Sequence, residues 1–84
     1  MTDFEKTKLE IALKEFTLRN FEKPNKCRNL DQIRYYIEEL CLKIEEYETK
    51  FQYVPEWAYI LLTQYNGVQN SYLYENFHRT YAQP

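Results

Sequence analysis

The sequence contains a single glycine and three prolines among its 84 residues. Glycine and proline supply the tight turns that join short strands, so a chain with so few of them is not a typical all-β protein. The same shortage favours long helices joined by few connections. A chain of this length forms one domain at the small end of what folds alone. We therefore expect a single all-α domain over residues 1–84, built as a small helical bundle.

Metal-ligating and catalytic side chains are also scarce. The chain has one histidine, His78, and two cysteines, Cys27 and Cys41, which cannot complete a closed zinc site without carboxylates. No Gly-rich loop is present to hold phosphate, and no serine or cysteine stands at a recognisable catalytic spacing from His78. The sequence therefore predicts a protein that is not an enzyme and has no cofactor or metal.

Long apolar runs and a large excess of charge are absent as well. No stretch approaches the roughly 20 apolar residues of a membrane span, and no apolar segment opens the chain as in a signal peptide. The formal net charge is −2, so no global field draws the chain towards nucleic acid. We expect a cytoplasmic protein without membrane contact, with reduced thiols. Cys27 would be a loop thiol, and Cys41 would act as a small apolar residue beside the core.

The clearest positive signal is a stripe of apolar residues between positions 30 and 51. Their spacings alternate 3, 4, 3, 4, 3, 4, which places all of them along one side of one helix. Asn29 is a good N-cap for this helix, and Gln32 stands at the capping-box position. Opposite the stripe, Tyr35 and Leu42 interrupt an otherwise polar surface. The stripe consists of Leu30, Ile33, Ile37, Leu40, Ile44, Tyr47 and Phe51.

A helix of matching length is predicted before the stripe. Thr2 and Glu5 form a capping box, which predicts a helix from Asp3 to about Phe21. Its apolar residues lie in two adjacent rows, wide enough to contact two neighbouring elements. A strand over residues 9–18 is the alternative, because part of this segment also alternates with period two. Pro24 ends the helix, and a short loop returns the chain, so residues 2–51 are expected to form a long antiparallel hairpin. The two rows are Phe4, Ile11 and Leu18, and Leu9, Ala12, Leu13 and Phe16.

The last third of the chain is poor in charge and rich in aromatic residues. It predicts two shorter helices, over residues 55–66 and 71–82, with Pro55 at the start of the first. Asn66 and Gly67 would end that helix, with Gly67 in the left-handed conformation, and Ser71 would cap the second. So many aromatic side chains cannot all be buried in so small a domain. Tyrosine and tryptophan are enriched in interfaces between proteins.

These observations predict a small non-enzymatic protein–protein interaction module that associates with itself. Its partner-binding residues would be Tyr35, Leu42, Trp57, Tyr59, Tyr72 and Tyr74. One alternative is a regulator or inhibitor that docks on a larger protein. The other is a weak anion or nucleic-acid binder that uses basic residues around the first connection, at positions 19–34. Those residues are Arg19, Lys23, Lys26, Arg28 and Arg34.

Overall fold

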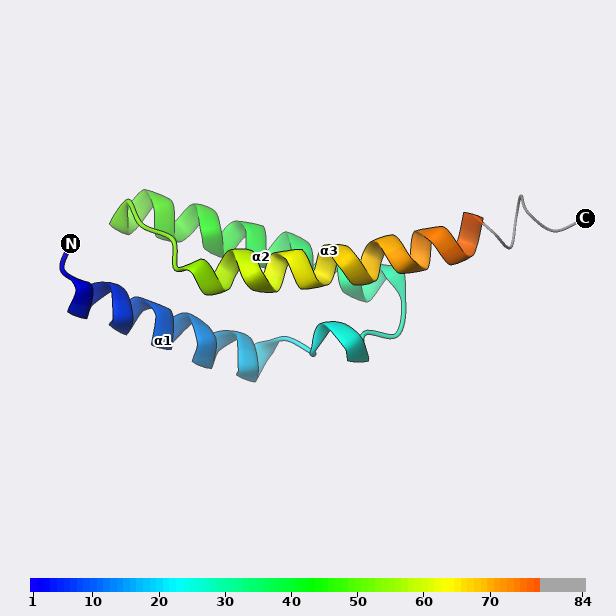
Figure 1. Cartoon of the computed structure of the whole chain (residues 1–84), viewed down its shortest axis with the longest axis horizontal. Coiled ribbons are helices and arrows are strands. Elements are labelled where there is room, and N and C mark those ends of the chain that lie inside the picture. Colours follow the sequence, from blue (N-terminus) through cyan, green and yellow to red (C-terminus); the bar gives the residue numbers. More distant parts are fainter. Residues whose placement is uncertain (78–84) are drawn as a thin grey trace, which may run out of the picture.

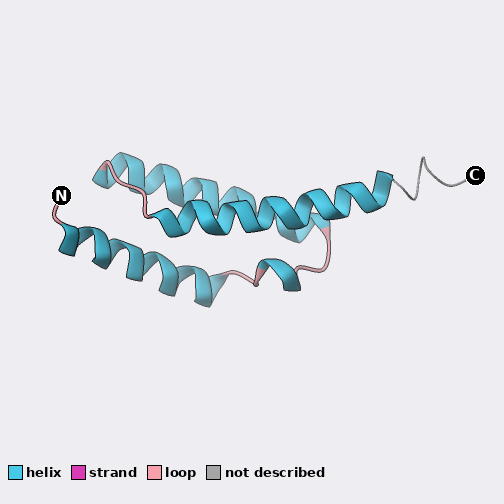
Figure 2. Ribbon diagram, in the orientation of Figure 1, coloured by secondary structure: helices cyan, strands magenta, loops and turns pink. Residues whose placement is uncertain are grey.

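Three long helices lie side by side along one axis of the molecule (Figures 1 and 2). The structure is a computed structural model, and it describes residues 1–77. Helix α1 spans Asp3–Asn20, α2 spans Leu30–Phe51 and α3 spans Glu56–Phe77, with a short 3₁₀ helix, η1, at Pro24–Lys26. The described residues contain no strand. The predicted all-α class is confirmed, and the strand considered for residues 9–18 is replaced by helix.

The helix starts follow the capping signals in the sequence. The backbone N–H of Glu5 donates to Thr2 Oγ1 over 3.2 Å, and the N–H of Gln32 donates to Asn29 Oδ1 over 2.9 Å. The α2 bounds agree with the prediction, and the helix ends at Gln52, which adopts the left-handed conformation with φ of 51°. Each cap satisfies a backbone donor that a helix N-terminus otherwise leaves unpaired.

The prediction of two C-terminal helices is wrong, because α3 continues through Asn66 and Gly67 without interruption. Gly67 does not have a positive φ. An interior glycine costs about 1 kcal/mol relative to alanine in a helix, and packing on both sides of it outweighs that cost. Tyr65 is fully buried, and Val68 and Tyr72 pack against the core. The predicted end of the last helix, at residue 82, lies outside the described residues.

The apolar stripe of α2 packs on α3, and this pair forms the centre of the molecule. The facing residues of α3 also follow spacings of 3, 4, 3 and 4, so both helices present matching stripes along their length. Ile33 and Leu40 are fully buried between them. The α3 stripe consists of Ala58, Leu61, Tyr65, Val68 and Tyr72.

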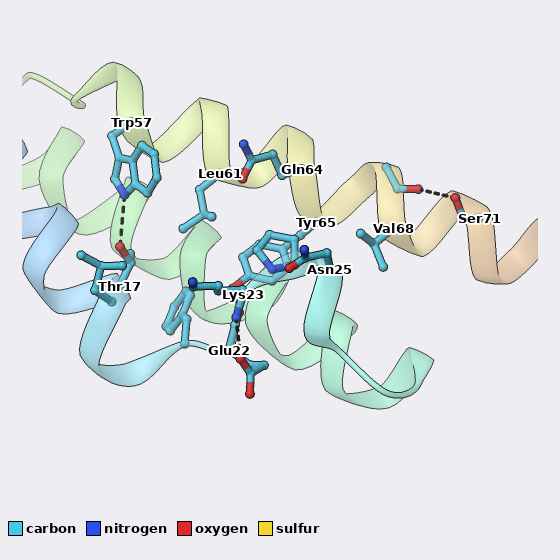
Figure 3. Close-up of a pocket in the computed structure, with 14 residues that line it drawn as sticks. Thr17, Glu22, Lys23, Asn25, Trp57, Leu61, Gln64, Tyr65, Val68 and Ser71 are labelled. Atoms are coloured by element: carbon cyan, nitrogen blue, oxygen red, sulfur yellow. Dashed lines mark hydrogen bonds between the residues drawn. The ribbon is translucent and has the colours of Figure 1, made fainter.

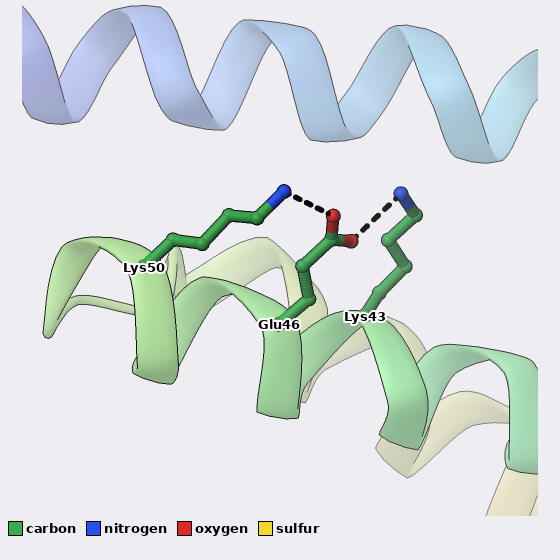
Figure 4. A network of polar contacts seen from close by, with 3 residues as sticks. All are labelled: Lys43, Glu46 and Lys50. Carbon is green, nitrogen blue, oxygen red and sulfur yellow. Dashed lines mark hydrogen bonds and ion pairs between the residues drawn. The ribbon is translucent and has the colours of Figure 1, made fainter.

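Helix α1 runs antiparallel to α2, as the hairpin prediction required, but it packs mainly on α3 (Figure 1). Leu13 and Thr17 form its buried side. The reason lies on α2, where polar side chains face α1. Figure 4 shows Lys43, Glu46 and Lys50 pointing from α2 towards α1. A face of this kind cannot provide the apolar seam that the hairpin prediction assumed.

An aromatic cluster joins the three helices near the end of α1. The ring of Phe21 lies 5.1 Å from that of Tyr36 and 6.3 Å from that of Tyr65, centroid to centroid. Tyr36 and Tyr65 are 5.6 Å apart. Cys27 is buried beside this cluster, whereas Cys41 is exposed. The roles expected for the two cysteines are therefore reversed.

Candidate protein-interaction site

The six residues predicted to bind a partner fall into two groups. Tyr35, Leu42, Tyr59 and Tyr74 are exposed, each by about half or more of its surface. Trp57 and Tyr72 are half-buried. The exposed four do not form one patch. Tyr35 and Leu42 lie on the side of α2 away from α3, and Tyr59 and Tyr74 lie on the side of α3 away from α2, because the packed stripes face each other.

Trp57 and Tyr72 make hydrogen bonds inside the fold. The Trp57 indole N–H donates to Thr17 Oγ1 over 3.1 Å, and the Thr17 hydroxyl in turn donates to the carbonyl of Lys14 over 3.0 Å. The Tyr72 hydroxyl donates to the carbonyl of Cys27 over 3.0 Å. Both rings therefore connect the helices, and only their outer edges remain available to a partner.

A groove of about 740 Å³ lies between the end of α1, η1 and the middle of α3. Figure 3 shows Trp57 at one end and Val68 and Ser71 towards the other, with Lys23 and Asn25 on the side of η1. Tyr65 lies in its wall, and its hydroxyl donates to the carbonyl of Glu22. Burial raises the pKa of Tyr65 well above its usual range, so this hydroxyl stays protonated as a donor at neutral pH.

Cationic side chains cover the aromatic rings around α1. The Lys14 ammonium lies 5.5 Å from the centroid of the Trp57 ring, and that of Lys43 lies 4.4 Å from the centroid of Phe16. Glu46 accepts from Lys43 and Lys50, each over 3.0 Å, and these two partners hold its pKa below the usual range (Figure 4). The Lys43 side chain thus reaches from α2 to α1, where its ammonium contacts both the Phe16 ring and the Glu46 carboxylate.

The sequence prediction for one apolar row of α1 is wrong. The row Phe4, Ile11 and Leu18 was expected to contact a second neighbouring helix. In the structure it faces outwards, with 72%, 52% and 71% of each residue exposed. The buried side of α1 is instead the one that holds Leu13 and Thr17. The spacing of seven residues was visible in the sequence, but nothing in the sequence says that only one row finds a neighbour.

The five basic residues of the alternative site are all exposed and spread over several elements. Arg19 ends α1, Lys23 and Lys26 flank or belong to η1, and Arg28 and Arg34 bracket the start of α2. A second hollow, of about 350 Å³, contains Arg28 but is also lined by Asp31 and Glu75. The negative charges of these two carboxylates would repel an anion bound in this hollow. The anion-binding site therefore stays a prediction.

Three further features concern metal ligands, the buried thiol and the hydropathy of the helices. No group of three or more His, Cys, Asp or Glu side chains in residues 1–77 is placed to hold a metal ion. Burial, together with the nearby Glu22, raises the pKa of the Cys27 thiol, which disfavours a reactive thiolate. Within the same residues, no helix combines the length and the hydropathy needed to cross a membrane.

Fold and surface together define a small all-α bundle with apolar rows on the outer sides of its helices. The chain matches no family model, no curated protein and no solved structure. Its function must therefore be argued from its own surface.

Proposed function

We propose that this chain is a non-enzymatic protein–protein interaction module that associates with itself. One observation carries the proposal. In the described residues, twelve large apolar side chains are exposed, whereas seven apolar residues are buried in the core. A scattered apolar residue on a surface needs no explanation, but rows of them along helices are typical of surfaces that bind other proteins.

The arrangement of the exposed residues supports binding to a helical partner. Phe4, Ile11 and Leu18 repeat every seven residues on α1, and Tyr35 and Leu42 do so on α2. A spacing of seven keeps side chains along one side of a helix, as in helix–helix interfaces. A second copy of a helical bundle is a partner that presents the same kind of surface.

The size of the core also favours a partner. A domain of this length buries a smaller fraction of its surface than larger domains do, so its stability is only a few kcal/mol. Burial of exposed apolar area against another chain adds about 25 cal/mol per Å² before the costs of association. Self-association would therefore stabilise this fold.

The test is the mass in solution, measured by sedimentation or light scattering as the chain concentration increases. We expect the mass to rise from 10.4 kDa towards twice that value. A mass that stays at that of a single chain up to about millimolar concentration would contradict self-association, because a millimolar dissociation constant corresponds to only about 4 kcal/mol of binding free energy. That result would favour the alternative of a regulator that docks on a larger protein.

A further inference from the structure

The outer side of α1 carries a row of three exposed apolar residues at intervals of seven. Phe4, Ile11 and Leu18 cover two intervals of seven residues, and each is at least half exposed. The row lies opposite Leu13, which is buried against the rest of the bundle. On α2, by comparison, the exposed row contains only Tyr35 and Leu42, a single interval of seven.

Charged residues beside this row have an unusual order. Glu5, Lys8, Glu15 and Arg19 are all exposed and flank the row on one side, with the small residue Ala12 between them. Glu5 and Arg19 lie seven residues on either side of Ala12. Lys8 lies four residues before it and Glu15 three after. If a second copy of the helix lies antiparallel to the first with the two centres aligned, each acidic residue is therefore level with a basic residue of the other copy.

None of these four charged groups takes part in an ion pair within residues 1–77, where the ion pairs join Glu46 to Lys43 and Lys50. We propose that a second copy of this chain packs on the outer side of α1, with the two α1 helices antiparallel across a two-fold axis near Ile11 and Ala12. This inference rests on the proposed self-association and names its surface and geometry.

The two-fold axis follows from the pattern of charge. In such an interface each residue faces the residue that lies about as far from the axis on the other side of the helix centre. Lys8 of one copy would therefore face Glu15 of the other, and Glu5 would face Arg19. By symmetry each pair occurs twice. A parallel pairing would instead place the two copies of each charge at the same level but on opposite sides of the contact, so Lys8 would not meet Glu15 and Glu5 would not meet Arg19. The sequence of charges therefore favours the antiparallel arrangement.

The groove at the end of α1 supports the same geometry. Leu18 lines this groove together with Trp57 and Leu61. Phe4 and Leu18 are equidistant from Ile11, so the antiparallel arrangement brings Phe4 of one copy level with Leu18 of the other. Phe4 is the most exposed large apolar side chain of the described surface, at 72%. It would lie at the mouth of a hollow with apolar walls.

The contact area sets the expected strength. Eighteen residues of α1 span about 27 Å. One side of a helix of this length has a smaller area than the roughly 800 Å² that each partner buries in a standard interface. The dimer should therefore be weak and depend on concentration.

The decisive experiment compares Ile11→Glu with Leu42→Glu by sedimentation over a range of concentrations. Ile11 and Leu42 have side chains of the same size and are 52% and 54% exposed, respectively. Neither substitution should therefore unfold the chain. We expect Ile11→Glu, which sets two carboxylates together at the axis, to raise the dimer dissociation constant by roughly a hundredfold or more. Leu42→Glu tests the competing row on α2. The control is Leu73→Glu, at an exposed leucine of α3 (42%), which should leave the dissociation constant unchanged, and circular dichroism should show full helicity for all three variants.

The outcomes separate the inference from the proposed function. A wild-type chain that is monomeric at every concentration overturns both. A wild-type dimer that persists in Ile11→Glu overturns the α1 surface but keeps self-association. A dimer that is lost only in Leu42→Glu places the contact on α2 and overturns the inference in the same way.

Charge reversal provides a test that does not depend on the apolar row. Lys8→Glu and Glu15→Lys should each weaken the dimer by roughly tenfold, because each pair occurs twice, and the double variant should recover the wild-type dissociation constant. Equal weakening by the single and double variants would contradict the pairing, and it would do so even if Ile11→Glu failed to fold.

Orientation is tested by cross-linking in a Cys41→Ser background. Glu5→Cys and Arg19→Cys chains are mixed and treated with a short bifunctional maleimide. In the antiparallel dimer, two copies of position 5 are about 21 Å apart along the axis, so only the mixture should cross-link efficiently. Cross-linking of either variant with itself, in place of the mixture, would indicate a parallel dimer and overturn the geometry.

Discussion

Thr17 shows how a polar residue becomes part of the buried side of α1. Only 3% of it is exposed, yet both functions of its hydroxyl are satisfied, since it donates to the Lys14 carbonyl and accepts from the Trp57 indole. A buried polar group is tolerated when it is hydrogen-bonded in this way. The burial of Thr17 could not be predicted from the sequence, because no local pattern shows that Trp57 uses it as an acceptor.

Replacement of Thr17 by valine should therefore destabilise the chain. Valine keeps the branched shape but leaves the Trp57 N–H without its acceptor, which should cost about 1–2 kcal/mol. Urea unfolding monitored by the fluorescence of Trp57, the single tryptophan, measures this change. Thr63→Val is the control, because the Thr63 hydroxyl is exposed and bonds only to its own helix at Tyr59. Equal stability of the two variants would show that the indole contact contributes nothing.

The two cysteines differ in burial in the opposite sense to the sequence prediction. Cys27 follows η1 in a connection, where a thiol is normally exposed, but its Sγ lies against the aromatic cluster and donates to the Lys23 carbonyl over 3.5 Å. Cys41 lies within α2 but outside the stripe that packs on α3. Burial of a loop residue depends on how the loop folds back, which local sequence patterns do not determine.

Thiol labelling should distinguish the two residues. Cys41 should react rapidly with an aromatic disulfide reagent at about pH 8, whereas Cys27 should react slowly because burial shields it and raises its thiol pKa. Mass spectrometry of the labelled peptides identifies which cysteine has reacted. Labelling in denaturant gives the reaction rate of each thiol when it is fully exposed. Equal rates for Cys27 and Cys41 in the folded chain would contradict the structure around η1.

At the scale of whole elements, the sequence predicted the helix starts better than the helix partners. The Thr2 and Asn29 caps are local, and both are found. The stripe of α2 was also recognised correctly, but its partner was not. The matching stripe on α3 includes Tyr65, Val68 and Tyr72, which lie on both sides of Gly67. A helix break predicted at Gly67 divided that stripe and hid it.

Gly67 provides a test of the continuous α3 helix. Its φ is negative, and a Cβ placed on it would meet no atom within 4 Å. Gly67→Ala should therefore stabilise the chain by about 0.5–1 kcal/mol, because alanine favours the helix and restricts the unfolded chain. The thermal midpoint should rise by roughly 2–8 °C.

The sign of this effect is informative. If Gly67 instead ended a helix in the left-handed conformation, alanine would be strained there and the midpoint would fall. Gly67→Pro is the opposing control, since it removes a helix hydrogen bond and should destabilise the continuous helix by about 3 kcal/mol or more.

On the scale of the whole molecule, the fold consists of a well-packed pair, α2 and α3, and a third helix held on one side. The outer side of α1 then remains available, and this could not be predicted, because helix periodicity shows which residues share a side but not which side is covered. Polar groups on α2, including Lys43 and Glu46, turn α1 towards α3 and leave Phe4, Ile11 and Leu18 exposed. The candidate surface is thus a consequence of how three helices pack.

Thermal stability should consequently depend on the concentration of the chain. A dimer that dissociates on unfolding becomes more stable by mass action, by about 1.4 kcal/mol per dimer, or 0.7 per chain, for each tenfold increase in concentration. For a domain of this size that corresponds to a rise in the midpoint of up to roughly 3–5 °C per tenfold increase. Ile11→Glu should have a midpoint that does not change with concentration. Scanning calorimetry over about a hundredfold range would measure both, and a wild-type midpoint independent of concentration would show that folding is not coupled to association.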